Sequence, residues 1–583
     1  MRPDPHRLHG GELALSLSAP TLRLATAVVL LVWVVAGSAP SAEAQNTARA
    51  VRVPISKDDG SLTPYTFQFN YPLVTLVYDT LMWRNKRGSP EAWLARSLRK
   101  SDAGRRITIR VRKDVRWHDG KPLTAEDVAF SFRHFAARFH PRFTPQLEAV
   151  ERAEALDRET VQITLRRASP GFEDQPLSDL PILPRHLWEG LPAGKLAPEG
   201  LPVGSGPYRL AEYRRGKRYV FRENRGYFRG RPTVQRIEVP FIGDFAKTVR
   251  ALEDRRVDMI PVTLPEREQD RLRRSVFEIG DGALYTGTTL MFNLRKPPFD
   301  KPEARQAVAR AFDLRRMARA NVNGGDDSKP ADRGYLHPES RWASPNPLQR
   351  FELKRARSEL AKLDLPRIRI MAPDNDPVRL EAGRQVVLAL ERAGARAVLG
   401  KLAPDKLAAA VGQDGSSPTF EAAIGSSPAL ASQDPDFLRV VFGSSRRAPL
   451  NYTGYKSAKF DKLAAEVAAA TNPETRRQKV QSELKLLAND APVVPLFFQQ
   501  GAFAYRPQVY SRWVVLPGTG ILDKRSFLRT SIKPSKRGSG TTLPAGSEGA
   551  GGGIGIPGTI ALALMGIVLV LLTLGLVGRL VRR

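Results

Sequence analysis

Cysteine is missing from the whole 583-residue chain. The protein therefore has no disulfide bond, no thiolate metal site, no cysteine nucleophile and no lipid attached through an N-terminal cysteine. Histidine is also sparse, with 7 residues, and none of them shows H-E-x-x-H or another ligand spacing. The sequence thus predicts no metal site, and a dispersed site built by the fold is the alternative.

Acidic residues are in short supply. The chain has 60 Asp and Glu against 91 Lys and Arg, a formal net charge of +31. Such an excess could attract nucleic acid, anionic lipid or acidic solutes. The basic residues are scattered, however, and neither a zinc spacing nor an RNA-binding aromatic motif accompanies them, so no nucleic-acid partner is expected.

An apolar run near the N-terminus follows a basic segment. The run extends from Leu24 to Ala36, Arg23 precedes it, and the small-residue pattern Ala42-Glu43-Ala44 follows. This three-part pattern predicts a secretory signal peptide over residues 1–44, with the mature chain beginning near Gln45. An uncleaved membrane anchor is the alternative.

A second apolar run lies at the C-terminus. Ile556 to Val577 contains no charged residue, and about 22 residues at ~1.5 Å each suffice to cross a hydrocarbon core of ~30 Å. Arg579, Arg582 and Arg583 follow the run, so the positive-inside rule places this tail in the cytoplasm. The Gly- and Ser-rich stretch 534–555 before it is expected to be a flexible linker.

The most chemically suggestive stretch is DVRWHDGKPLTAEDVAFSF, residues 114–132, which contains His118 next to Asp119. Adjacent residues on a turn point in different directions, and Asp119-Gly120 is a turn dipeptide, so we interpret the pair as scaffold. Residues 204–208, GSGPY, match neither a Walker A loop nor a nucleophile elbow. The sequence therefore predicts no catalytic residue.

Local patterns predict both strands and helices. Residues 107–112 alternate between apolar and polar side chains, as in a half-buried strand. Thr124 and Asp127 form a capping box, and Val128, Phe132, Phe135 and Phe139 are predicted to lie on one helix face. Asn472-Pro473 predicts another helix start, followed by a stripe of Val480, Leu484 and Leu487. These patterns indicate an α/β or α+β protein.

Six motifs occur in a characteristic order along the chain. They are LVYDTLM (76–82), VRWHDGKPLTAEDV (115–128), LPILPRHLWE (180–189), PVGSGPYRL (202–210), TLMFNLRKPPFDKPEARQAVARAFD (289–313) and NYTGYKSAKFDKLAAEV (451–467). Together they resemble the family 5 extracellular solute-binding proteins of ABC transporters, the peptide/nickel-binding group. The second and fifth motifs are the most specific of the six.

The resemblance implies an α/β fold of the two-lobed periplasmic binding protein type (type II, large cluster), with an extra subdomain. The C-terminal apolar run adds one transmembrane helix, which is a departure from the family. Two crossover strands would join the lobes. The expected organisation is a signal peptide (1–44), a solute-binding part (45–533), a linker (534–555), a transmembrane helix (556–578) and a basic cytoplasmic tail (579–583). Within the solute-binding part we expect a first lobe (about 50–79, 196–285 and 500–533), an extra subdomain (about 80–195) and a second lobe (about 286–499).

The function implied by the resemblance is solute capture outside the cytoplasmic membrane. A peptide or peptide-like solute would bind between the lobes and pass to an ABC permease and its ATPase, without a cofactor and without bond chemistry. The alternatives are a ligand sensor of the same fold and an envelope enzyme acting on peptidoglycan fragments. The sensor would lack a permease partner, and the enzyme would need an acid/base or metal constellation that the sequence does not display.

The resemblance also implies ligand-binding segments. Peptide-binding members hold an extended ligand partly by backbone pairing, and the matching segments are Phe69-Asn70-Tyr71 and Tyr285-Thr286-Gly287.

The family's peptide binders also hold the ligand's ammonium with an aspartate four residues before the proline of a D-P segment. That proline is Pro435, so the position falls on Ala431, while Asp434 and Asp436 are nearby but out of register. An ammonium buried without a carboxylate would cost about 3–5 kcal/mol. Either the ligand is not a typical peptide or a shifted alignment supplies Asp434, and the sequence slightly favours a ligand other than a standard dipeptide.

Overall fold

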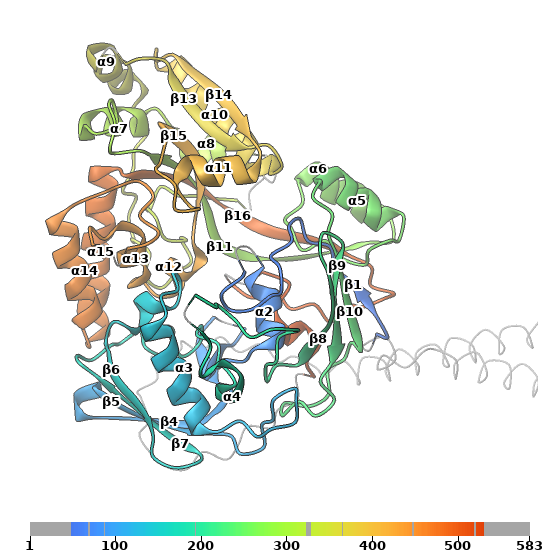
Figure 1. Cartoon of the computed structure of the whole chain (residues 1–583). Coiled ribbons are helices and arrows are strands. Elements are labelled where there is room, and N and C mark those ends of the chain that lie inside the picture. Colours follow the sequence, from blue (N-terminus) through green and yellow to red (C-terminus); the bar gives the residue numbers. More distant parts are fainter. Residues whose placement is uncertain are drawn as a thin grey trace, which may run out of the picture. The chain divides into compact units, whose positions relative to one another are not determined.

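The computed structural model describes residues 48–529, apart from 68–69, 87, 193, 322–327, 364, 446–447 and 518–519 (Figure 1). The expected signal peptide, linker, transmembrane helix and cytoplasmic tail lie outside the described residues. Among the helices that are described, none has the length and apolarity needed to span a membrane.

The first lobe is built around a four-stranded sheet in the order β1-β10-β9-β8. Its strands are β1 (Val51–Arg52), β8 (Tyr208–Arg214), β9 (Arg218–Glu223) and β10 (Arg236–Pro240). The short strand β1 runs parallel to β10, whereas the other neighbours are antiparallel. Three helices, α2 (Tyr71–Val77), α5 (Phe245–Glu253) and α6 (Glu266–Arg273), belong to this lobe.

The extra subdomain has an antiparallel sheet in the order β4-β5-β7-β6. The strands are β4 (Ala95–Ser101), β5 (Arg106–Val111), β6 (Val150–Ala155) and β7 (Thr160–Leu165), and the hairpin of β2 (Met82–Arg84) and β3 (Pro90–Ala92) precedes them. The shorter elements here are η2 (Asp102–Gly104), η3 (Thr144–Leu147) and α4 (Arg185–Trp188).

Helix α3 (Ala125–Ala137) covers this sheet, and the capping box predicted from sequence is present at its start. The Asp127 carboxylate accepts a 2.8 Å hydrogen bond from the Thr124 backbone N–H. The predicted stripe is buried at Val128, Phe132 and Phe135, but Phe139 lies beyond the helix end and is 59% exposed. The prediction was wrong for Phe139 because helical periodicity alone does not mark where a helix stops.

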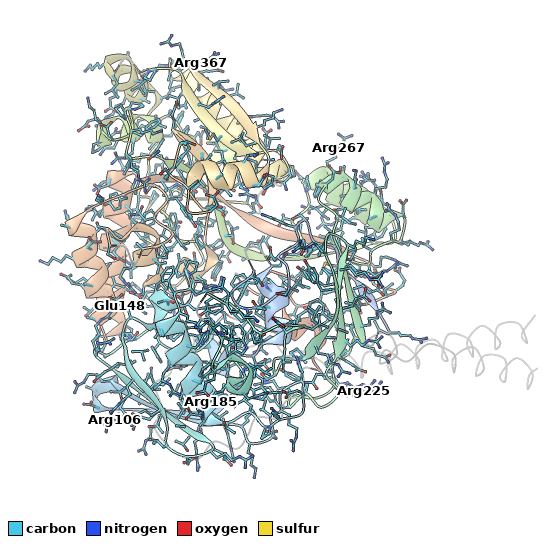
Figure 2. All side chains as sticks on the ribbon, viewed as in Figure 1. Arg106, Glu148, Arg185, Arg225, Arg267 and Arg367 are labelled. Carbon is cyan, nitrogen blue, oxygen red and sulfur yellow. The ribbon has the colours of Figure 1, made fainter. Side chains whose placement is uncertain are left out.

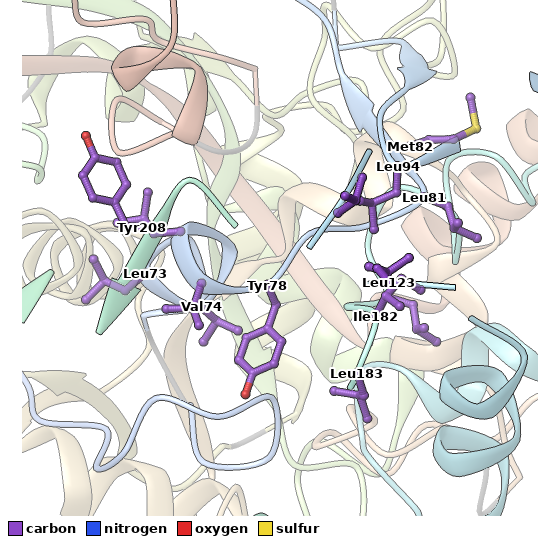
Figure 3. Close-up of a cluster of buried hydrophobic side chains, with 14 of the residues drawn as sticks. Leu73, Val74, Tyr78, Leu81, Met82, Leu94, Leu123, Ile182, Leu183 and Tyr208 are labelled. Atoms are coloured by element: carbon purple, nitrogen blue, oxygen red, sulfur yellow. The ribbon is translucent and has the colours of Figure 1, made fainter. Parts of the chain in front are cut away.

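One apolar core serves both the first lobe and the extra subdomain. Figure 3 shows Leu73 and Val74 of α2 and Tyr208 of β8 in the same buried cluster as Leu123 and Ile182 of the subdomain. A shared core couples the two regions mechanically, because separating them would expose this apolar surface to water.

The second lobe contains a six-stranded mixed sheet in the order β12-β16-β11-β15-β13-β14. The strands are β11 (Glu278–Phe292), β12 (Lys329–Pro330), β13 (Ile368–Pro373), β14 (Ala397–Leu402), β15 (Ala422–Ser427) and β16 (Val493–Tyr505). The helices of this lobe are α7 (Pro302–Arg310), α8 (Leu314–Ala320), α9 (Leu353–Leu363), α10 (Pro377–Arg392), α11 (Pro404–Val411), α12 (Ala429–Gln433), α13 (Phe437–Phe442), α14 (Ala458–Ala469) and α15 (Pro473–Asp490). A last 3-10 turn, η4 (Lys524–Phe527), returns to the first lobe, where Phe527 joins its core.

Strands β11 and β16 connect the lobes (Figure 1). One half of the pair joins residues 278–283 to 500–505, and the other half joins 287–291 to 493–498. Ala504 packs in a core with residues of α5 and α6, whereas Leu290 and Leu496 pack in the core of the second lobe. The structure is thus the two-lobed α/β fold expected from the sequence, with two crossover strands.

The positive charge is spread over the molecule. Figure 2 labels Arg106 and Arg185 in the extra subdomain, Arg225 and Arg267 in the first lobe, and Arg367 in the second lobe, well apart from one another. Many arginines pair with a nearby carboxylate, such as Arg185 with Glu189 at 2.8 Å. This distribution agrees with the interpretation that the charge is a property of the composition and not a focused binding patch.

Candidate ligand-binding site

A cavity of about 880 Å³ is lined by residues of both lobes and of the extra subdomain. The lining residues fall in the segments 65–84, 139–142, 178–196, 286, 408–415, 428–437, 449–452 and 522–523. The volume lies in the upper part of the range of ~300–1,000 Å³ found for sites that bury most of a small molecule. The cavity can therefore hold a solute larger than a single amino acid.

Aromatic side chains form the wall contributed by the first lobe and the subdomain. The rings of Phe67 and Tyr71 lie 5.0 Å apart, and Phe67 and His140 lie 5.7 Å apart. Tyr65 meets His140 edge-on at 5.3 Å. Burial lowers the pKa of His140 to about 4, so this imidazole is neutral at pH 7 and adds to an apolar surface.

A buried ion pair supports this wall. Arg142 donates two hydrogen bonds to the Asp179 carboxylate, at 2.9 and 2.7 Å, and its guanidinium lies 4.0 Å from the centre of the Tyr71 ring. Burial alone would raise the pKa of Asp179, but the Arg142 charge and a hydrogen bond from Gln146 outweigh it and leave the pKa below its usual value. The pair is held by a bidentate contact that fixes the orientation of both side chains.

A second arginine, Arg84 at the end of β2, lines the cavity. It donates to the Asp174 carboxylate at 3.2 Å and to the Asp174 carbonyl oxygen at 3.1 Å. Asp174 also receives a hydrogen bond at 3.1 Å from Arg341 of the second lobe. Asp174 therefore links the subdomain to the second lobe beside the cavity.

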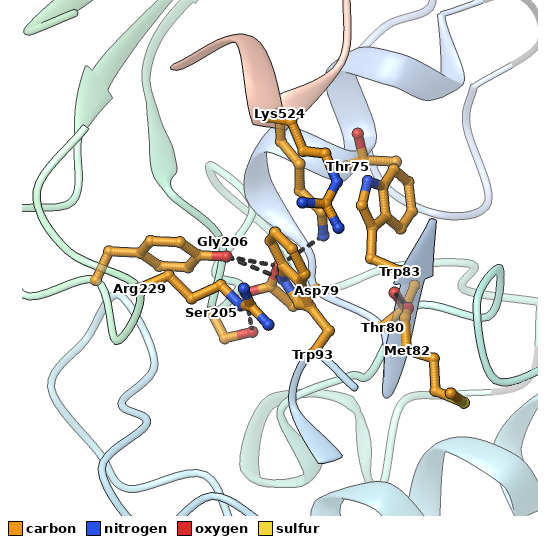
Figure 4. A network of polar contacts seen from close by, with 12 residues as sticks. Thr75, Asp79, Thr80, Met82, Trp83, Trp93, Ser205, Gly206, Arg229 and Lys524 are labelled. Atoms are coloured by element: carbon orange, nitrogen blue, oxygen red, sulfur yellow. Dashed lines mark hydrogen bonds and ion pairs between the residues drawn. The ribbon is translucent and has the colours of Figure 1, made fainter. Parts of the chain in front are cut away.

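A buried polar network lies next to the lining residue Trp83 (Figure 4). The Asp79 carboxylate accepts hydrogen bonds from Lys524 and Trp93, both at 2.8 Å, and from Tyr227 at 3.1 Å. The Lys524 ammonium lies 4.1 Å from the centre of the Trp83 ring. Asp79 and Lys524 are 445 positions apart and have fully buried side chains, so this network ties the C-terminal segment to the start of the first lobe.

Strand β11 is irregular where it passes the cavity. Its pairing with β16 shifts between Ala283 and Gly287, and its pairing with β15 begins only at Gly287. Within the described strands, residues 284–286 therefore have no ladder partner, and Thr286 lines the cavity. Backbone N–H and C=O groups that a bulge takes out of the ladder can pair with another chain.

The predicted site residues lie in different places relative to the cavity. Tyr71 and Thr286 line the cavity, whereas Phe69 lies outside the described residues. The Asn70 amide donates to the Asp59 carboxylate at 3.0 Å and so fixes the loop before α2. The Tyr285 ring stacks on His337 with 4.8 Å between centres.

Gly287 is enclosed in the sheet. Its N–H donates to the Ser427 hydroxyl at 3.0 Å, and a Cβ at this position would lie 2.6 Å from the Phe498 ring. Gly287 thus allows close packing at the end of the unpaired stretch of β11.

The structure brings neither Ala431 nor Asp434 to the cavity lining. Ala431 is buried in the second-lobe core, although Leu430 and Gln433 of the same helix, α12, do line the cavity. The Asp434 carboxylate pairs with Arg476 at 2.5 Å, and these side chains are only 3% and 4% exposed. A carboxylate already neutralised in this way is a poor counter-ion for a ligand.

His118 and Asp119 point to different partners. The His118 ring accepts a hydrogen bond from the Gly204 N–H at 3.2 Å and donates one to the Gly206 carbonyl at 3.0 Å. Asp119 instead contacts His186 at 2.7 Å. His118 therefore holds the GSGPY loop in place, which is the scaffold role predicted from the sequence.

Sequence reasoning missed Arg142, Asp179 and Phe139 as cavity residues. No motif marks them, and the Arg142–Asp179 pair joins positions 37 residues apart. Among the described residues, no group of three or more His, Asp or Glu side chains is arranged to hold a metal ion.

Two lobes, two crossover strands and a cavity lined from both sides define a solute-binding protein of the periplasmic binding protein type. The chain belongs to the bacterial extracellular solute-binding proteins, family 5, whose family model (the "Middle" model) matches residues 89–448. This is the family whose motifs the sequence resembles.

Similar proteins agree with this assignment. The oligopeptide-binding protein AppA of Bacillus subtilis (strain 168) is 23% identical over 455 residues, which cover 74% of this chain and 82% of AppA. The probable peptide-binding protein YejA of Agrobacterium fabrum is 26% identical over 283 residues, 43% of this chain and 45% of YejA. The chain thus spans less than half of YejA's length.

A solved structure shows the same fold. The ABC transporter-associated periplasmic binding protein DppA from Helicobacter pylori, in complex with the peptide STSA, superposes with a TM-score of 0.71 at 20% identity. The alignment covers 83% of this chain and 98% of DppA.

Proposed function

We propose that the protein captures a peptide or peptide-like solute between its lobes and delivers it to the permease of an ABC importer. Family membership supports the solute-binding role, AppA and YejA are named as an oligopeptide-binding and a probable peptide-binding protein, and the DppA structure is a complex with a peptide. The observation that carries the proposal is the cavity of about 880 Å³ beside the unpaired stretch 284–286 of β11.

The unpaired stretch suggests how a peptide would be held. An extended ligand next to residues 284–286 would take the place that β15 leaves after Ser427 and would form backbone hydrogen bonds there. The rest of the cavity would accommodate its side chains. Tyr71 and Thr286 stay in this proposal as contact residues, whereas Asp434 is replaced by the backbone of β11 as the main polar contact.

The two strands that connect the lobes suggest how the lobes could close over a ligand. β11 and β16 are the crossover strands, and their pairing is interrupted next to the cavity. Such an interruption is a natural place for a hinge, because fewer ladder hydrogen bonds resist bending there. Closure over the ligand would exclude water and present the surface that the permease recognises.

We propose for the chain the domain boundaries and the membrane topology that the sequence predicts. The signal peptide (1–44) would export the chain, the solute-binding part (45–533) would lie on the outer side of the cytoplasmic membrane, and residues 556–578 would anchor it. The linker 534–555 would give an effective concentration near the permease in the ~mM range, so weak docking would be sufficient. Binding alone, without catalysis, is the proposed activity.

The test is a thermal-shift screen with the full-length protein in a mild detergent. Pools of di- to hexapeptides are compared with sugars, opines, metal chelates and murein fragments. A peptide at 100 times its Kd is expected to stabilise the protein by about 2.7 kcal/mol. Stabilisation by a non-peptide pool alone would refute the peptide assignment, and release of an altered product from any ligand would refute pure binding.

A further inference from the structure

The cavity has few side chains that can carry a full charge at neutral pH. Among the described lining residues they are Arg84, Arg142, Asp179, Asp414 and Asp523. A peptide brings an ammonium and a carboxylate, each of which is costly to bury without a partner. Whether these five side chains already have partners therefore decides whether they can neutralise the two charged ends of a peptide.

Both arginines are already matched by carboxylates. Arg142 holds Asp179 through two hydrogen bonds, and Arg84 holds Asp174 through its side chain and its carbonyl. The Arg142 pair cannot turn toward a ligand without losing the bidentate contact and its place over Tyr71. Neither arginine is thus available to a ligand carboxylate at low cost.

The two remaining carboxylates are no better placed for an ammonium. Asp523 is 1% exposed and accepts hydrogen bonds from the Arg525 N–H at 2.8 Å and from Trp83 at 3.4 Å. Burial also raises the pKa of Asp523, which disfavours its charged form. Asp414 is exposed and accepts from the Ser416 N–H at 3.0 Å, so water screens any ion pair that it makes.

Apolar side chains are exposed where the charged ones are engaged. Phe139 of the extra subdomain is 59% exposed, Leu196 just after that subdomain is 54% exposed, and both line the cavity. Leu430 and Leu450 of the second lobe line it as well. Exposed large apolar side chains that gather at a cavity mark a surface that a ligand covers.

We propose that the cavity recognises a peptide by its backbone and its apolar side chains, and that none of the described lining side chains serves as a dedicated counter-ion for either terminus. This inference rests on the proposed function of peptide capture. It specifies the ligand class as peptides of several residues with apolar side chains, whose ends remain in water and are therefore tolerated whether charged or blocked. Fragments cut from the interior of a longer chain and end-modified peptides would be bound alike.

The experiment compares two degenerate hexapeptide libraries on the full-length protein in detergent. One library has free termini, and the other has the same sequences with an N-acetyl group and a C-terminal amide. Peptides retained by the protein are identified by mass spectrometry, and several are synthesised in both forms for calorimetry. The Kd values of the free and blocked forms are expected to agree within about threefold, as for exposed, screened charges.

The outcomes separate this inference from the proposed function. A loss of about thirtyfold or more on blocking either terminus, which a buried charge pair would produce, overturns the inference and leaves peptide capture standing. If neither library yields a retained peptide, peptide capture fails, and the inference fails with it.

One double variant and one control variant test the recognition of the ligand by apolar side chains. The combined substitution Phe139→Ala and Leu196→Ala is expected to weaken the blocked peptides by about tenfold or more, because it removes apolar surface that the ligand covers. Leu156→Ala is the matched control, since Leu156 of the extra subdomain is 56% exposed but does not line the cavity. Equal affinity for the double variant and the control would overturn the apolar recognition.

Discussion

The buried pair of Arg476 and Asp434 gives the sharpest prediction about stability. Arg476, on α15, contacts the Asp434 carboxylate at 2.5 Å, lies over the Trp342 ring at 4.9 Å, and donates to the Val467 carbonyl at 3.3 Å. Both members of the pair are almost completely buried. Removing one partner from such a pair leaves an uncompensated charge and costs about 3–5 kcal/mol.

We therefore expect Arg476→Met to lower the free energy of unfolding by about 3–5 kcal/mol at pH 7. Methionine keeps most of the apolar contact with Trp342, so the loss reports mainly the unpaired carboxylate of Asp434. Adding Asp434→Asn should recover about 2 kcal/mol or more, because the amide carries no charge but can still accept the hydrogen bond that Asp434 takes from the Asp436 N–H at 3.1 Å.

The measurement is urea denaturation of the full-length protein followed by circular dichroism. The matched control is Arg477→Met on the same helix, because Arg477 is 48% exposed and its nearest carboxylate, Glu474, is 3.9 Å away. The control should change stability by about 0.5 kcal/mol or less. A cost below about 1 kcal/mol for Arg476→Met, or a double variant no more stable than the single one, would refute the reasoning.

Three further predictions concern pH and packing. Burial raises the pKa of Glu483, so the contribution of this side chain to stability is greatest below its unfolded pKa. That contribution falls by about 1.4 kcal/mol per pH unit as the pH rises toward the folded pKa. Glu483→Gln should remove this slope in urea titrations above pH 4.5, and an unchanged slope would contradict the prediction. Because burial lowers the pKa of His140 to about 4, calorimetry should show constant ligand affinity from pH 8 to about 5.5, and a midpoint near 6.5 would count against a neutral aromatic wall. A Cβ on Gly171 would lie 1.7 Å from the Asp434 carboxylate, so Gly171→Ala should push the subdomain away from the second lobe and weaken ligand binding by about tenfold. The control is Gly226→Ala, which should leave the measured Kd unchanged because no atom lies nearer than 3.8 Å to the added Cβ.

Short-range features of the fold could be predicted from the sequence. The alternation over 107–112 corresponds to β5, the capping box at Thr124 starts α3, and Asn472-Pro473 starts α15. Each of these signals depends on residues a few positions apart, where the chain's own geometry fixes the contacts. The family motifs then supplied the two-lobed arrangement that local patterns cannot give.

The site depends on contacts that no local pattern contains. Asp434 was a candidate counter-ion because of its place before Pro435, but Arg476, 42 positions later, neutralises it. One signal was present: Arg476 lies four residues before Val480, and Glu483 three residues after it, on the buried face of α15. Charged residues in a predicted apolar stripe indicate a buried partner, although they do not say which one.

The position of the cavity explains why ligand binding and lobe movement can be coupled in this fold. The stretch 284–286 belongs to a crossover strand, so a peptide that pairs with it would replace missing ladder hydrogen bonds at the proposed hinge. The ligand would also contact Phe139 of the subdomain and Leu430 of the second lobe, which both line the cavity. A ligand that contacts both sides stabilises the conformation in which both are in reach, and its affinity sets how far that equilibrium can shift. Ion pairs across the same boundary, such as Arg341 with Asp174 at 3.1 Å, would add to this conformation without contacting the ligand. Recognition that depends on the backbone and on apolar contacts would thus use the same surface to select the ligand and to close the lobes.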